Sequence, residues 1–298
     1  MPDERDRRRR EHWLVLGMLF DDNRFVRQPG FTAESSATTT RDPKSPFRAE
    51  LFDGQGRLLL RAGIPLTAPC SDGPSGADLP FRIAEGTIPL PAETRLVNFM
   101  LDDMLVEEYR VPEGEPRTDL TVVPEPGARG VVMVAWESSH PEGVDLTHVV
   151  GFSSDDGVTW QGVALPTNGN EVELDLDALP GGERCRVCVK TTDGVHTITA
   201  VSEPIALPVK PCLAMILAPE ADTRLEQGSP LHLQGQGYWL EEHRAELENL
   251  VWSSSLAGAL GSGPNIDVAG LEAGKHEITL AAGEGDRVGT ASIEIVVG

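Results

Sequence analysis

Short runs of hydrophobic residues, separated by turn-forming residues, recur along the whole chain of 298 residues. Some runs alternate strictly, as in residues 171–177, where Val172, Leu174 and Leu176 are separated by acidic residues. A period of two places successive side chains on opposite faces of a β-strand. The 31 glycines and 23 prolines are scattered between such runs, as expected for many strands joined by tight turns. The pattern predicts an almost entirely β protein, in which Glu241–Leu250 is the segment expected to form a short helix.

The number and spacing of these runs predict three tandem β-sandwich domains, since a chain of this length holds two or three domains of ~100–150 residues each. We expect a basic flexible tail at residues 1–12, followed by sandwiches at 13–117, 118–209 and 210–298. In the first sandwich, Asp-Gly and Asp-Asp pairs between apolar runs predict two hairpins, at 47–61 and 95–110.

Hydrophobic residues make up 40% of the chain, which is enough for packed cores and too many for a disordered polypeptide. Trp136 and Trp252 lie in apolar runs of the second and third predicted sandwiches. Because a tryptophan brings a large apolar surface into a core, we expect each of them to anchor the core of its own domain.

Negative charge is concentrated in the last two thirds of the chain. The formal net charge is −22, and residues 118–298 hold 27 of the 47 acidic residues but only 9 of the 25 basic ones. A surface this negative repels phosphate backbones, so the composition argues against nucleic acid as a partner. Such a surface is typical of a soluble protein, and it could also attract cations or a basic protein face.

The four cysteines, Cys70, Cys185, Cys188 and Cys212, form no evident disulfide framework. Cys185 and Cys188 have the spacing of a CxxC motif, but they lie in a predicted strand. Residues three apart in a strand point to opposite faces of the sheet. We therefore predict that these two cysteines bind no metal and form no bond to each other.

The N-terminal segment places four arginines before a run of eight mostly apolar residues, Trp13 to Phe20. It lacks the small-residue cleavage site of a secretory signal peptide. No later segment approaches the ~20 apolar residues of a membrane span. Together with the missing disulfide framework, these features favour the cytoplasm. The alternative, favoured by the family resemblances below, is an extracellular location reached without a signal peptide.

The second predicted sandwich combines several features of one known domain type. Leu179-Pro-Gly precedes a strand, Trp136 lies in an early strand, and Ser202-Glu-Pro lies near the end. Residues 118–209 therefore resemble a fibronectin type III domain. In that family a tyrosine six residues after the leucine usually ties the corner of the sandwich. This chain has Cys185 at that position, which departs from the family pattern.

The third predicted sandwich contains Trp-Ser-Ser at 252–254, Leu-Gly-Ser-Gly at 260–263 and a Leu-x-x-Gly-x-His-x-Ile-Thr-Leu run at 271–280. This string resembles the immunoglobulin-like, PKD-related repeats found at the ends of large bacterial proteins. The order of the three units resembles the C-terminal tail of such multidomain proteins. The resemblance implies an array of three immunoglobulin- and fibronectin-like β-sandwiches.

Residues 153–160, SSDDGVTW, match the Asp-box pattern S-x-D-x-G-x-T-W at every defined position. The motif resembles the turns on sialidase propeller blades, where these turns are structural and repeated. We expect a hairpin turn in which Asp155 accepts from turn amides, Gly157 takes a positive φ and Trp160 packs beneath. The single copy predicts a structural turn.

Candidate chemistry is sparse along the chain. Acidic pairs at 21–22, 102–103 and 155–156 leave calcium binding as an alternative, although no loop has the ligand spacing of a calcium site. The seven histidines are scattered, and neither HExxH nor G-x-S-x-G occurs. No catalytic residue, metal or cofactor is predicted. The adjacent Tyr238 and Trp239 have no assigned place in a core, and they are the candidate contact surface.

These observations predict a non-enzymatic protein-binding or structural adaptor, whose partner is another protein or a second copy of the chain. Exposed sandwich edges and grooves between domains are the expected binding surfaces. The alternative is an accessory carbohydrate- or surface-binding module of an extracellular bacterial system.

Overall fold

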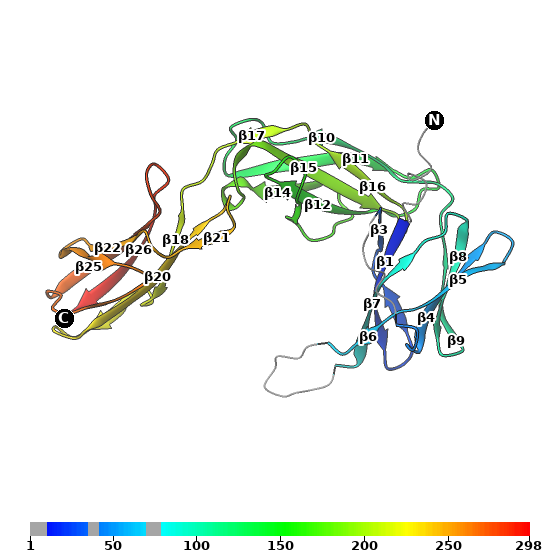
Figure 1. Ribbon diagram of the computed structural model, residues 1–298, viewed down its shortest axis with the longest axis horizontal. Coiled ribbons are helices and arrows are strands. Elements are labelled where there is room, and N and C mark those ends of the chain that lie inside the picture. The colour runs from blue at the N-terminus through cyan, green and yellow to red at the C-terminus, as the bar shows by residue number, and fades with distance from the viewer. Residues whose placement is uncertain (1–10, 35–41, 70–78) are drawn as a thin grey trace.

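Three β-sandwiches follow one another along the chain in the computed structural model, which describes residues 11–34, 42–69 and 79–298 (Figure 1). Each sandwich consists of two mainly antiparallel sheets, and each has its own hydrophobic core. The second sandwich lies between the other two, and the strands of the first run across its long direction (Figure 1). The prediction of an all-β array of immunoglobulin- and fibronectin-like domains is confirmed.

The first sandwich packs a sheet in the order β2-β1-β7-β6, with β3 also paired to β1, against a sheet in the order β5-β4-β8-β9. Both predicted hairpins are present, as the β4–β5 and β8–β9 pairs. Trp13, Phe47 and Phe99 are fully buried between the sheets. The strands are β1 (Glu11–Phe20), β2 (Phe25–Arg27), β3 (Phe31–Glu34), β4 (Phe47–Asp53), β5 (Leu58–Gly63), β6 (Leu66–Thr67), β7 (Phe81–Pro89), β8 (Thr94–Leu101) and β9 (Met104–Arg110).

The second sandwich packs the three-stranded sheet β10-β11-β14 against the sheet β13-β12-β15-β16, to which β17 is added through β15. Trp136, Leu174 and Cys185 lie in its core. Strand β13 is only two residues long, and it follows a turn at residues 153–160 that is held by its own side chains. The elements are β10 (Arg117–Val122), β11 (Val131–Ser139), β12 (Thr147–Ser153), β13 (Gln161–Gly162), β14 (Glu171–Asp175), the 3-10 helix η2 (Leu176–Ala178), β15 (Gly182–Thr192), β16 (Thr197–Val201) and β17 (Ile205–Leu207).

The third sandwich packs the sheet β18-β20-β21, with β24 paired to β20, against the sheet β19-β26-β25-β22-β23. Trp252 is fully buried in its core, together with Leu233 and Leu280. The strands are β18 (Leu213–Ala218), β19 (Thr223–Leu225), β20 (Leu231–Trp239), β21 (Arg244–Glu246), β22 (Leu250–Ser254), β23 (Gly258–Ser262), β24 (Asn265–Val268), β25 (Gly274–Ala282) and β26 (Gly289–Val297).

Two of the expected boundaries fall one or two residues inside a strand. Strand β1 begins at Glu11, because its first residues pair with β3 and β7 and so belong to the sheet rather than to the predicted tail. Strand β10 begins at Arg117, opposite Ser139 of β11. The basic residues at positions 5–10 and Cys70 lie outside the described residues.

The helix expected at Glu241–Leu250 is a wrong prediction. The segment forms a turn followed by β21, which pairs with β20 so that Arg244 lies opposite Trp239. The carboxylate of Glu246 accepts from Trp239 Nε1 (3.0 Å) and from the backbone amides of Glu248 (2.9 Å) and Asn249 (3.1 Å). Hydrogen bonds from the Asn249 amide and from Trp239 lower the pKa of Glu246 to about 2. These bonds satisfy local amides, so the chain does not need helical hydrogen bonds here.

Candidate functional site

The junction between the first two sandwiches gathers polar residues that are far apart in the sequence. Asp193, in the β15–β16 turn, has a fully buried carboxylate that accepts from the amides of Val195 (2.8 Å) and His196 (2.7 Å). Its Oδ2 also accepts from His196 Nδ1 (2.8 Å) and lies 3.4 Å from His140 Nε2. Burial raises the pKa of Asp193, but the His196 and amide hydrogen bonds outweigh it, and the net pKa is lowered.

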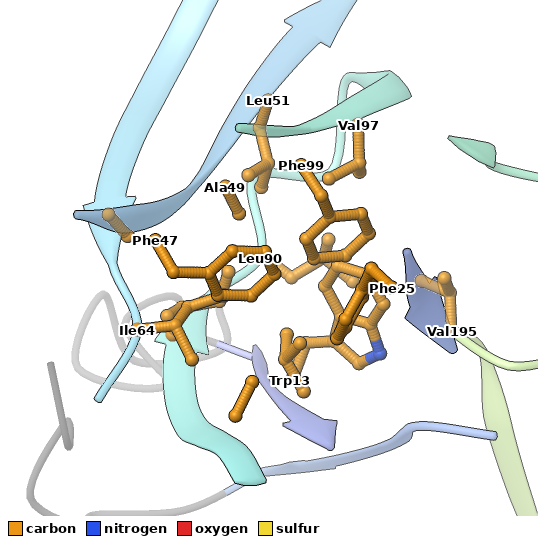
Figure 2. Packing of buried hydrophobic residues seen from close by; sticks show 14 of the residues in the cluster. Trp13, Phe25, Phe47, Ala49, Leu51, Ile64, Leu90, Val97, Phe99 and Val195 are labelled. Carbon is orange, nitrogen blue, oxygen red and sulfur yellow. The ribbon is translucent and has the colours of Figure 1, made fainter. Parts of the chain in front are cut away.

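The same turn inserts a side chain into the neighbouring domain. Val195 is fully buried and belongs to the core cluster of the first sandwich, beside Trp13 and Phe25 (Figure 2). Trp13 Nε1 donates to the carbonyl oxygen of Gly194 (2.9 Å), and Thr192 Oγ1 donates to that of Gly30 (2.7 Å). The second sandwich therefore contributes one side chain to the core of the first, and hydrogen bonds join the two domains at this turn.

A second layer of contacts covers this turn from strand β9 of the first sandwich. Tyr109 donates its hydroxyl to the carbonyl oxygen of Asp193 (3.1 Å), and the guanidinium of Arg27 stacks over the Tyr109 ring at 3.8 Å. Arg27 Nε lies 3.5 Å from Glu107 Oε1. Burial raises the pKa of Glu107, and the charge of Arg27 offsets only part of that effect. The contacts make the first junction a packed interface between domains.

The histidine and carboxylate groups of this junction are enclosed by the protein. The side chains of His140 and Asp193 are 0% exposed, and His140 Nδ1 accepts from the amide of Glu142 (3.1 Å). The buried pair is therefore closed to a substrate in this structure. Their arrangement holds a turn in place, and sequence analysis missed it because the residues lie more than 50 positions apart.

The junction between the second and third sandwiches is built around one carboxylate. Glu241 Oε1 accepts from the amides of Gly181 (3.0 Å) and Lys210 (2.8 Å), which belong to the second sandwich and the connecting segment. Arg287 pairs with both Glu241 (2.5 Å) and Glu242 (2.8 Å). Its Nε donates to the carbonyl oxygen of Lys210 (3.1 Å). These bonds connect the third domain to the backbone of the second.

Trp239 is not available for the contact surface that the sequence predicts at Tyr238 and Trp239. Trp239 is only 3% exposed, and Arg287 stacks over its ring at 4.6 Å. The apolar alternation along β20 turns Trp239 inward, where Glu246 accepts from its indole nitrogen. Tyr238 is half-buried on the opposite face of the strand. The two residues therefore do not form one exposed aromatic platform.

The turn at residues 153–160 is held by its own polar side chains. Both carboxylate oxygens of Asp155 accept from the amide of Thr159 (2.8 and 3.1 Å), and its Oδ2 accepts from the Thr159 hydroxyl (2.6 Å). Ser153 Oγ donates to Asp155 Oδ1 (2.7 Å). Positive φ angles occur at both Asp156 (63°) and Gly157 (86°). The bonds from Thr159 and Ser153 lower the pKa of Asp155 to about 2.

Trp160 ends this turn and lies over the outer face of the second sandwich. A Cβ atom placed on Gly151 would be 2.9 Å from Cys188 Sγ and 3.5 Å from Cε3 of Trp160. Gly151 thus leaves the space that the indole and the thiol occupy. Cys185 lies on the other face, in the core. Both cysteines are free and buried, and burial raises the pKa of each thiol.

We expect Asp155→Ala to lower the melting temperature of the second sandwich by a few degrees, because several turn donors lose their acceptor. The pKa of about 2 in the folded state lies below the ordinary value of 3.8. The carboxylate therefore contributes stability above pH ~4 that is lost as the pH falls toward 2. Thermal unfolding at pH 7 and at lower pH should show the difference from wild type shrinking. Asp145→Ala, at an exposed aspartate, is the control, and equal melting temperatures at pH 7 would contradict the assignment.

The outer face of the β10-β11-β14 sheet combines exposed apolar and acidic side chains. Val134 and Trp136 point into the core, so their neighbours on β11 point outward. Val131 is 63% exposed and Met133 is 39% exposed. The strand register places Met133 directly opposite Glu173, and Val131 opposite Asp175, on the edge strand β14. We call the outward side chains of this sheet the β11 face; they are Asp119, Val122, Val131, Met133, Glu137, Glu171, Glu173 and Asp175.

Most carboxylates of the β11 face have no neutralising partner. Among the described residues, Asp119, Glu137, Glu171 and Glu173 make no ion pair. Asp119 lies directly opposite Glu137 in the register of β10 and β11. Like charges in directly opposite positions of an antiparallel pair repel each other. The face is therefore apolar along its centre, and its charge favours a cationic neighbour.

In the described part of the chain, no group of three or more His, Cys, Asp or Glu side chains is arranged to hold a metal ion. None of its helices is both long and apolar enough to cross a membrane.

No protein-family model and no curated protein sequence matches the chain. Similar solved structures include the fibronectin(III)-like modules of CbhA from Clostridium thermocellum, with 15% identity and a TM-score of 0.26 over 61% of this chain and 94% of that chain. The four N-terminal Ig domains of Dscam1 isoform 4.4 have 13% identity and a TM-score of 0.23, over 85% of this chain and 66% of that chain. Dpr2 Ig1-Ig2, in complex with DIP-Theta Ig1-Ig3, has 10% identity and a TM-score of 0.24, over 62% and 99%. TM-scores this low carry no functional argument, and the fold is established by the strand order.

Proposed function

We propose that this chain is a non-enzymatic adaptor that binds a basic segment of another protein on the β11 face of its second sandwich. The observation that carries the proposal is an exposed apolar centre, Val131 and Met133, bordered by carboxylates without partners. Hydrophobic contacts would supply affinity, and the surrounding charge would select a partner rich in lysine or arginine.

The junctions support the adaptor role because they join the domains through side chains rather than through flexible linkers. Val195 enters the core of the first sandwich, and Glu241 accepts from backbone amides of the second domain and the connecting segment. A partner bound to the middle sandwich would thus be held at a defined distance from whatever contacts the outer two. The enclosure of the His140–Asp193 pair supports a role other than catalysis.

The β11 face can be tested by photo-crosslinking followed by reconstitution. A photoreactive amino acid replaces Val131 in the full chain, and Leu217, 53% exposed on the third sandwich, is the matched control position. In an extract of the native host, we expect the Val131 position to give a discrete crosslinked protein that the Leu217 position does not. That protein is then purified and its affinity for the unmodified chain is measured.

The affinity measurement distinguishes the β11 face from the general acidity of the chain. The variant Met133→Ser/Glu171→Gln/Glu173→Gln is expected to weaken binding by at least ~10-fold, because it removes the apolar centre and two charges. The control Leu217→Ser/Glu226→Gln/Glu277→Gln makes the same kinds of change on the third sandwich and should alter affinity by less than ~2-fold. Equal losses in both variants would indicate unspecific attraction and would contradict the proposal.

A further inference from the structure

Lys210 lies in the segment that connects the second and third sandwiches. Its side chain is 7% exposed, and its Nζ lies 3.6 Å from Oδ1 of Asp177. Among the described residues, Nζ has no hydrogen-bond partner. An ammonium group has three N–H donors, and a buried donor without an acceptor costs free energy. The backbone on both sides is held by Glu241 and Arg287, so the side chain has a defined starting point.

Lys210 lines a cavity of about 310 Å³ whose walls come from both domains. Arg129 and Asp177 contribute from the second sandwich, and Leu213 and Leu240 contribute from the third. Arg129 is exposed and forms no ion pair in the described part of the chain. The cavity therefore combines two cationic groups, one carboxylate and an aliphatic wall.

Most of the other cations in residues 118–298 lie beside a carboxylate of their own. Five of the other seven basic residues in 118–298 contact a carboxylate at 2.5–3.8 Å; they are Arg184, Arg186, Arg244, Lys275 and Arg287. The cavity that Lys210 and Arg129 line holds one carboxylate, that of Asp177, which lies 3.6 Å from Lys210 Nζ and whose side chain is 57% exposed. A negatively charged group entering this cavity would meet two cations for one carboxylate, and the N–H donors of Lys210 that have no acceptor.

We propose that the cavity between the second and third sandwiches binds a small molecule or chain end that carries a carboxylate on an aliphatic body. The carboxylate accepts from Lys210 Nζ and from the Arg129 guanidinium, and the aliphatic part packs against Leu213 and Leu240. At ~30 Å³ for each water-sized group, the volume suits about ten non-hydrogen atoms. This site is separate from the β11 face. A free aliphatic acid and the C-terminal leucine of a peptide both supply this chemistry.

The Asp177→Asn variant distinguishes ligand binding from a purely structural role of Lys210, because only ligand binding predicts a higher affinity in this variant. The Asp177 carboxylate interacts with the same ammonium that the ligand needs, so it competes with the ligand. Asp177→Asn should remove this competition and tighten binding by a few-fold. Lys210→Met should weaken binding by ~10-fold or more, and Arg129→Gln should weaken it by a few-fold. Lys190→Met, at an exposed lysine on β15 outside the cavity, is the matched control.

The test uses nuclear magnetic resonance titration of the isotope-labelled full chain with three probes. They are 4-methylpentanoate, N-acetyl-alanyl-leucine and the same dipeptide with an amidated C-terminus. We expect one or both carboxylates to shift the amide resonances of Leu213, Leu240 and Thr290, and the amidated probe to leave them unchanged. Saturation by 4-methylpentanoate alone would assign the site to free acids, and saturation by the dipeptide alone would assign it to peptide ends.

Three results would overturn the proposal. The first is no shift at these amides with either carboxylate at millimolar concentration. The second is equal binding of the amidated probe, which would show that the carboxylate is not recognised. The third is weaker binding in a folded Asp177→Asn variant. The Asp177 and Arg129 variants keep the test valid even if Lys210→Met disturbs the junction, since their side chains are exposed.

Discussion

Replacing Trp252 with alanine is expected to lower the free energy of unfolding of the third sandwich by ~3–5 kcal/mol and to leave the other two unchanged. Trp252 is fully buried, and its Nε1 donates to the carbonyl oxygen of Gly263 (2.9 Å). A Cβ atom on Gly235 would lie 2.8 Å from Cζ2 of Trp252, so the glycine leaves space for the indole. Hydrogen exchange, resolved by peptides of each domain in denaturant, measures the three stabilities separately.

Trp136 provides the matched comparison in the second sandwich. It is 1% exposed, but its indole nitrogen has no hydrogen-bond partner among the described residues. Trp136→Ala should destabilise the second domain by a similar ~3–5 kcal/mol. Replacement by phenylalanine should separate the two sites. Trp252→Phe leaves the Gly263 carbonyl without its donor and should cost ~0.5–1.5 kcal/mol more than Trp136→Phe. Equal costs for the two phenylalanine variants would contradict the role of the Gly263 bond.

The hydrophobic pattern predicted the parts of the fold that depend on neighbouring residues. The alternation at 171–177 and the Asp-containing turns identified strand β14 and the hairpins of the first sandwich. Trp136 and Trp252 stand in apolar runs, and the structure places each in the core of its domain. In each case, the period of the hydrophobic residues and the turn-forming residues within a short segment are enough to predict the element.

The pattern failed where distant residues decide the outcome. Glu241–Leu250 contains good helix formers. However, the Glu246 carboxylate accepts hydrogen bonds from Trp239 and from nearby amides, and residues 244–246 pair with β20 as a strand. In the same contact Trp239 is buried, whereas the neighbouring residues alone predicted it to be part of an exposed contact surface. No local signal marks Glu241 as the residue that joins two domains, because Gly181 is 60 positions away.

In the candidate sites too, the sequence predicted what depends on neighbouring residues and missed what depends on distant ones. The outward carboxylates of β14 were predicted from alternation, but their apolar neighbours Val131 and Met133 are identified only by the strand register. The contact between Trp13 and Gly194 spans 181 positions and has no counterpart in any motif. Lys210 likewise reads as an ordinary lysine in a Pro-containing linker until its burial is known.

The largest effect on domain arrangement is expected from Asp193→Ala, which should destabilise the junction of the first two sandwiches by ~3–5 kcal/mol. The variant removes the acceptor for His196 Nδ1 and for two backbone amides, and it leaves buried donors unpaired. Val195 should then lose its place in the core of the first sandwich, since the turn that positions it is no longer held.

Hydrogen exchange at residues 11–20 and 192–197, together with small-angle scattering of the full chain, should report this uncoupling as faster exchange in both segments and a broader distribution of sizes. Asp145→Ala, at an exposed aspartate of the same domain, should change neither measurement.

Acid should weaken the junction of the first two sandwiches, as the Asp193→Ala substitution does. The pKa of Asp193 is lowered by folding, so its contribution is present above pH ~4 and is lost as the pH falls through the folded-state pKa. Glu107, whose pKa is raised by burial, opposes this trend as it becomes protonated. The wild-type junction should therefore loosen in acid more than that of the Asp193→Ala variant. An Asp193→Ala chain with unchanged exchange at residues 11–20 would show that Asp193 does not hold the two domains together.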